Sequence, residues 1–212
     1  MGKPAATDRP RLTPLSHSFT LDCNIYVASE RAGKRVMQNV TGFLQRRLKL
    51  KVNEAKSAVA RPQERKFLGF SFTGGREPKR RVAPKALLRC KQRVRELTRR
   101  TRGISLERMT KELAPYLRGW KSYFGYSQTP SVLHRLEEWI RRRLRSMIWK
   151  QWKRGKVRFE KLRQRNIRPA LAAQTAGSSH GPWRLANSPA LQSALPIAYF
   201  DALGLPRLLD LL

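Results

Sequence analysis

The spacing of apolar residues changes near residue 84, from short runs to helical periodicity. Before this position, apolar runs predict strands at residues 23–27, 50–52, 57–60 and 66–73, with a turn over residues 74–81. A helix from Ser29, a favourable N-cap, to about Lys49 is expected between the first two strands. The first part of the chain is therefore predicted to combine short strands with one helix.

Three helices are predicted after this change of pattern. The first begins at Pro84, and the second is capped by Ser105 and contains Pro115, where a kink or break is expected. The third begins at the pair 129–130, Thr followed by Pro, and ends before Gly155. The predicted fold class is α+β, a partial sheet followed by a helical bundle.

The charge of the chain is strongly positive. Lys and Arg number 46 and Asp and Glu 14, which gives a net charge of +32 on 212 residues. Such an excess favours binding to a polyanion, and nucleic acid binds basic proteins with release of condensed counterions. The alternative partner is an acidic membrane surface, which needs basic residues beside a free apolar face or a spanning segment. A spanning segment takes roughly 18 apolar residues, and the sequence has no such run. Charge therefore indicates nucleic acid, although it would also suit a ribosomal protein.

The positive charge is concentrated in the middle of the chain. Residues 21–88 have a net charge of +11, residues 89–168 a net charge of +19, and residues 169–212 a net charge of zero. Residues 1–20 are rich in Pro, Ser and Thr and predict a disordered leader. The neutral tail is expected to pack against the protein and not to contact RNA.

The third predicted helix combines an apolar face with a basic one. A helical wheel places five side chains on one apolar stripe: Leu133, Leu136, Ile140, Leu144 and Met147. Basic side chains and two indoles lie on the opposite side, where they would contact phosphates and stack on unpaired bases. The alternative is that both indoles cover apolar surface under the tail. The candidate RNA-binding residues are Lys91, Arg95, Arg99, Arg141, Arg142, Arg145, Trp149, Trp152, Lys153 and Arg154.

Carboxylates suited to catalysis are not apparent. The Asp residues are scattered, and the adjacent Glu137 and Glu138 would point about 100° apart on a helix. Cys23 and Cys90 are far apart and form no CxxC pair, which fits a reducing compartment. We therefore assign no catalytic residue, no metal and no cofactor.

Five segments, taken in order, resemble one protein family. LDCNIYV, ASERAGKRVMQNVTGFLQRRLKLKVNEAKSAV, RKFLGFSF, LRGWKSYFGYSQTP and AAQTAGSSHGPWRLANSPAL look like the C-terminal part of a bacterial group II intron reverse transcriptase/maturase. The resemblance implies the end of the polymerase palm at residues 21–84, the thumb or maturase (X) domain at 85–168 and a tail at 169–212. It does not cover residues 1–20. The segment resembling the primer grip is Phe67, Leu68, Gly69 and Phe70.

One departure from the family concerns the polymerase site. Members place Tyr-Ala-Asp-Asp before Cys-Asn-Ile-Tyr-Val, whereas this chain has Leu21 and Asp22 at the last two positions. Leu21 thus replaces an Asp that binds Mg²⁺ in intact members, and a two-metal reaction needs such carboxylates. We interpret the pair as a vestigial polymerase motif and do not expect polymerase activity from this chain alone.

Three functions remain open at this point. The first is a truncated maturase-type protein of the bacterial cytoplasm that binds structured RNA, above all group II intron RNA, and assists splicing. The second is a non-functional remnant of a mobile element. The third is one half of a split reverse transcriptase that would need an N-terminal partner.

Overall fold

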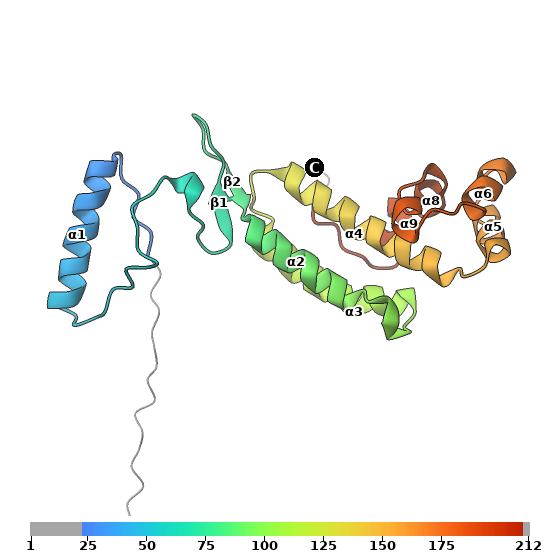
Figure 1. Ribbon diagram of the computed structural model, residues 1–212, viewed down its shortest axis with the longest axis horizontal. Helices are drawn as coiled ribbons and strands as arrows, with labels where there is room; N and C mark the ends of the chain where they lie inside the picture. The colour runs from blue at the N-terminus through green and yellow to red at the C-terminus, as the bar shows by residue number, and fades with distance from the viewer. Residues whose placement is uncertain (1–22, 210–212) are drawn as a thin grey trace, which may run out of the picture. The chain divides into compact units, whose positions relative to one another are not determined.

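The computed structural model describes residues 23–209 and divides the chain into two compact units, residues 1–59 and 60–212. The predicted leader, together with Leu21 and Asp22, lies outside the described residues. Figure 1 shows the elements of each unit. Helices dominate the described chain, and its two strands pair antiparallel, which confirms the α+β class with a helical bundle.

The described part of unit 1, residues 23–59, contains one helix, α1 (Glu30–Arg46). The side chain of Ser29 accepts a hydrogen bond from the backbone N–H of Ala32 at 3.2 Å, so the predicted N-cap is confirmed. The predicted strands at 23–27, 50–52 and 57–60 are wrong: none of these segments pairs with another. A strand needs a hydrogen-bonded neighbour, and a short apolar run by itself does not supply one. None of residues 23–59 is buried.

Unit 2 begins with a short 3₁₀ turn (Pro62–Glu64) and a hairpin. Strands β1 (Phe70–Phe72) and β2 (Arg80–Val82) pair antiparallel, with Phe70 opposite Val82. The predicted strand 66–73 is shorter than expected because Leu68 and Gly69 have φ values of 49° and 80° and turn the chain. The predicted turn also ends early, since Arg80 and Arg81 belong to β2.

The hairpin packs onto the helices of unit 2. The Phe70 ring lies 5.8 Å from that of Tyr123 and 5.2 Å from that of Phe124. The Tyr123 hydroxyl donates to the Leu68 carbonyl at 2.8 Å. The segment 60–84 therefore belongs structurally with the helices that follow it, although sequence resemblance assigns it to the palm.

Three long helices form the centre of unit 2: α2 (Pro84–Leu97), α3 (Leu106–Phe124) and α4 (Pro130–Gln151). Their predicted starts at Pro84, Ser105 and Pro130 are confirmed. The predicted break at Pro115 is absent, and α3 continues through it. Pro115 lies on the exposed side of α3, while the buried side chains before and after it, such as Leu113 and Leu117, hold both halves against the core.

The last part of α4 is covered by the C-terminal segment. The helix ends at Gln151, and Gly155, expected to terminate it, begins the next helix. A short 3₁₀ turn (Arg100–Arg102) joins α2 to α3. The remaining helices are α5 (Gly155–Arg163), α6 (Pro169–Ala176), α7 (Pro182–Leu185), α8 (Pro189–Ala194) and α9 (Ile197–Ala202). They gather around the end of α4 (Figure 1).

The neutral tail belongs to the core of unit 2, as predicted. Leu191, Leu195 and Phe200 are fully buried and share one hydrophobic cluster with Leu144 of α4. Each such side chain contributes about 1.5–3 kcal/mol through burial. The tail therefore decides which faces of α4 remain accessible.

Candidate nucleic-acid interface

Two of the predicted RNA-binding arginines are buried beneath the tail. Arg141 is 6% exposed and Arg145 is 9% exposed. The Nε of Arg145 donates to the Leu195 carbonyl at 3.1 Å, and its guanidinium lies over the Phe200 ring at 5.9 Å. Burial, and to a smaller extent the nearby charge of Arg141, lowers the pKa of Arg145. The expectation that this side of α4 is open to RNA is therefore not met for these two residues.

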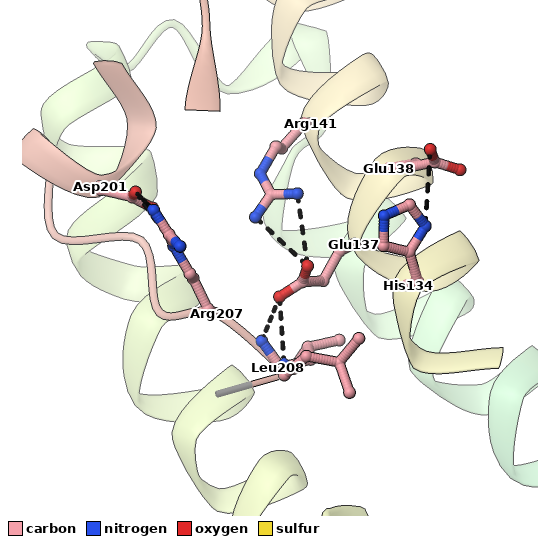
Figure 2. A network of polar contacts seen from close by, with 8 residues as sticks. His134, Glu137, Glu138, Arg141, Asp201, Arg207 and Leu208 are labelled. Atoms are coloured by element: carbon pink, nitrogen blue, oxygen red, sulfur yellow. Dashed lines mark hydrogen bonds and ion pairs between the residues drawn. The ribbon is translucent and has the colours of Figure 1, made fainter. Parts of the chain in front are cut away.

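Arg141 instead takes part in a buried ion pair, shown in Figure 2. One carboxylate oxygen of Glu137 accepts from both terminal nitrogens of Arg141, at 3.4 and 3.3 Å. The other oxygen accepts from the backbone N–H groups of Leu208 and Leu209. Because both oxygens are satisfied, the buried carboxylate holds the C-terminal segment against α4.

The neighbouring carboxylate behaves differently. Glu138 is exposed, and its contact with His134 spans 3.6 Å (Figure 2). The two adjacent glutamates thus have separate roles, one fixing the tail and one on the surface. A separate ion pair within the C-terminal segment joins Asp201 to Arg207 at 2.5 Å.

The two predicted stacking indoles also lie inside. Trp149 is 1% exposed and Trp152 is 8% exposed, with their ring centroids 6.0 Å apart. Arg158 lies over the Trp149 ring at 4.8 Å, and Arg165 lies over the Trp152 ring at 5.1 Å. Both indoles therefore belong to the hydrophobic cluster of unit 2, which agrees with the alternative that they cover apolar surface. The adjacent Lys153 and Arg154 are exposed.

Two of the predicted basic residues, both in α2, lie over an indole that the sequence did not single out. Lys91 and Arg95 both stand over the Trp139 ring of α4, at 5.5 and 5.4 Å. Arg99 is exposed just after the end of α2. These three positions follow one another at intervals of four residues.

A pocket of about 260 Å³ lies beside these residues, between α2, α4 and α7. Its walls include Arg95, Trp139 and Arg143 and, from α7, Pro182 and Trp183. The buried side chains of Ser146 and Met147 also line it. We name this cavity the α2–α4–α7 pocket. It combines two indoles with guanidinium groups at a surface of strong positive charge.

Contacts from α4 fix the walls of the pocket. Arg142 lies 4.3 Å from the centre of the Trp183 ring and donates from Nε and Nη2 to the Trp183 carbonyl, at 3.2 and 3.1 Å. Arg143 donates from Nε to the Thr98 hydroxyl at 2.5 Å and so ties α4 to the end of α2. Of the predicted arginines on α4, Arg142 is therefore the one placed near accessible aromatic surface.

The pocket residues missed by sequence reasoning are Trp139, Arg143 and Trp183. Trp139 lies two positions before the arginines at 141–143, and this proximity could have identified it. It was missed because only the apolar stripe and the side opposite it were considered on this helix. Trp183 lies in a segment of zero net charge, and nothing in its local sequence relates it to α4.

The segment resembling the primer grip forms a tight turn and not an extended strand. Phe67 and Phe70 exchange two backbone hydrogen bonds of 2.9 Å across Leu68 and Gly69. Leu68 is 63% exposed, and a Cβ at Gly69 would come within 3.0 Å of the Phe124 ring. A role in holding a primer stays a prediction from the sequence resemblance.

Residues 23–209 form neither a metal-binding cluster nor a membrane-spanning helix. Within this range no three His, Cys, Asp or Glu side chains gather in a way that would hold a metal ion. None of the described helices is long and apolar enough to cross a membrane.

Comparison with known proteins finds a similarity for part of unit 2. No curated protein matches the chain. Residues 87–166, which run from α2 to just beyond α5, match the model of the group II intron maturase-specific domain. The match covers the pocket walls from α2 and α4, and α7 lies outside it. The chain thus carries a region similar to the group II intron maturase-specific domain at residues 87–166, which confirms that part of the resemblance found in its sequence.

Proposed function

We propose that this protein binds group II intron RNA through the surface around the α2–α4–α7 pocket and assists splicing by stabilising the folded RNA. The observation that carries the proposal is the grouping of Lys91, Arg95 and Arg142 around two indoles, one half-buried and one exposed. The maturase-specific domain supports the choice of intron RNA as the partner.

Electrostatics supports RNA over a less charged partner. Residues 89–168 have 25 basic and 6 acidic residues, and the tail that covers part of α4 adds no net charge. The described ion pairs of α2 and α3 involve few of these cations, for example Arg93 with Glu96 and Arg102 with Glu112. Uncompensated Lys and Arg side chains at a surface neutralise phosphates and release counterions.

RNA recognition also uses flat side chains, which this surface provides. Unpaired bases of structured RNA stack on aromatic rings and on guanidinium planes. Trp183 is 41% exposed, in contrast to the buried Trp149 and Trp152. The surface therefore offers both phosphate contacts and stacking partners, whereas the opposite face of α4 is closed by the tail.

A salt titration tests the binding. Filter binding of the full chain to a group II intron RNA should show an affinity that falls by roughly 10³- to 10⁵-fold between 50 and 200 mM salt, as expected for 6–10 phosphate contacts. Binding that is absent, or that does not change with salt, would contradict the proposal.

A splicing assay tests the second part. The protein should raise the rate of intron self-splicing at a magnesium concentration too low for the RNA to fold alone. The same addition should have little effect at high magnesium, where the RNA folds without help. If the protein changes the splicing rate equally at both magnesium concentrations, or at neither, then assistance through RNA folding is contradicted. RNA binding, which the salt titration measures, would not be affected by this result.

A further inference from the structure

The α2–α4–α7 pocket has features of a site for a single flat ring. Its volume of about 260 Å³ lies just below the roughly 300–1,000 Å³ of pockets for drug-sized ligands. Trp139 and Trp183 contribute aromatic walls from different helices. Met147 and Pro182 add apolar surface, and Ser146 adds a hydroxyl.

The charges around the pocket indicate what kind of ring-bearing ligand would bind there. Arg95 and Arg143 line the cavity, while Lys91 stands over the Trp139 ring and Arg142 over the Trp183 ring. None of the residues that line the pocket is acidic. An aromatic or heterocyclic group flanked by negative charge meets these conditions, and a nucleotide within an RNA strand has this chemistry.

We propose that this pocket takes one unstacked nucleobase of the bound RNA, with the base against Trp183 and the flanking phosphates near Arg95 and Lys91. The inference rests on the proposed function and adds to it the part of the RNA that is recognised. Stacking of a base distinguishes this surface from one that binds RNA by charge alone, because a phosphate contact does not need an indole.

The pocket is held in shape before any ligand arrives. Arg142 donates two hydrogen bonds to the Trp183 backbone carbonyl, and its guanidinium lies over the Trp183 ring. Arg143 reaches the Thr98 hydroxyl and the Arg95 and Thr98 carbonyls, at distances of 2.5 to 3.4 Å. A wall that is already fixed loses little conformational entropy when a base enters.

The test compares a short oligoadenylate with an abasic strand of the same length, each bound to the full chain. The wild type should bind the base-bearing strand about tenfold more tightly, in line with the value of one stacked base. Trp183→Ala should lose most of this preference and bind the abasic strand like the wild type, and Trp183→Phe should keep part of it. The Arg142 hydrogen bonds end on the Trp183 backbone, so the alanine variant retains them.

Photocrosslinking gives a second measurement that needs no variant. An oligonucleotide with a thiolated base should crosslink the wild-type protein at Trp139 or Trp183. Crosslinks that map only to other segments would contradict the proposal that this pocket binds a nucleobase.

The remaining outcomes separate the two proposals. A wild type with no preference for the base-bearing strand, or a Trp183→Ala variant that keeps the full preference, overturns the nucleobase pocket. Intron RNA binding would still stand in both cases, because it is measured by the salt titration with structured RNA. Loss of that binding would overturn the proposed function itself.

Discussion

The two units of this chain have similar chemistry but differ in their interiors. Unit 1 presents apolar side chains that remain exposed, including Ile25 at 53%, Tyr26 at 62% and Phe43 at 55%, and none of its described residues is buried. Unit 2 buries a continuous cluster from Val82 to Leu208. Both units are basic, so charge does not distinguish them.

The difference shows that a core fixes the basic side chains of unit 2 in place, as the proposed binding surface requires, whereas those of unit 1 have no such support. In unit 2 the core positions Trp139 beneath Lys91 and Arg95, and it seals Arg141 and Arg145 away from solvent. In unit 1 no comparable interior orients the basic side chains of α1.

The largest effect is expected from Trp149→Ala in unit 2. Removing this fully buried indole should lower the free energy of unfolding by about 3–5 kcal/mol. Phe43→Ala in unit 1 is the control, and it should change the free energy of unfolding of unit 2 by no more than about 0.5 kcal/mol. All five Trp residues lie in unit 2, so Trp fluorescence during urea denaturation reports on that unit. A stable Trp149→Ala protein with weakened RNA binding would mean that Trp149 contacts RNA after all.

A somewhat smaller loss is expected from Glu137→Ala. The substitution leaves Arg141 and two backbone N–H groups buried without their acceptor, and breaking such a pair costs about 3 kcal/mol. Glu138→Ala is the matched control, since that neighbour is exposed, and it should change the urea midpoint little. Equal shifts for the two variants would show that the C-terminal segment is not held by Glu137.

The smallest effect concerns the two thiols, one in each unit. Cys23 is exposed, whereas burial raises the pKa of Cys90 to about 11. The thiolate is the reactive form, and at pH 8 a thiol of that pKa is ionised to roughly one part in a thousand. A thiol reagent should therefore label Cys23 in the native protein and Cys90 only after denaturation. Rapid labelling of both in the native state would mean that the core of unit 2 opens readily.

The sequence predicted the elements that depend on local chemistry. The caps at Ser29 and Ser105 and the first-turn prolines at Pro84 and Pro130 were all identified correctly, because each acts within four residues of its own position. Three of the four predicted strands failed for the opposite reason, since a strand depends on a partner that its own residues do not specify.

The candidate site was only partly predictable. The helical wheel placed Arg145 opposite the apolar stripe, but it could not show that Leu195 and Phe200, some fifty residues later, would cover this side chain. Lys91 and Arg95 were predicted to bind RNA, and their proximity to Trp139 became visible only in the structure. Trp183 was missed because its partner, Arg142, is 41 residues away in the sequence.

The central claim is most directly tested by the salt dependence of intron RNA binding in two charge-matched variants of the full chain. One variant replaces Lys91, Arg95 and Arg99 of unit 2 by Gln, and the other replaces the exposed Arg31, Arg35 and Arg47 of unit 1. Our account predicts that the first lowers the slope of log affinity against log salt by about 3, one for each lost phosphate contact, while the second leaves it near the wild-type value. Equal reductions in both, or a reduction in the second alone, would contradict it.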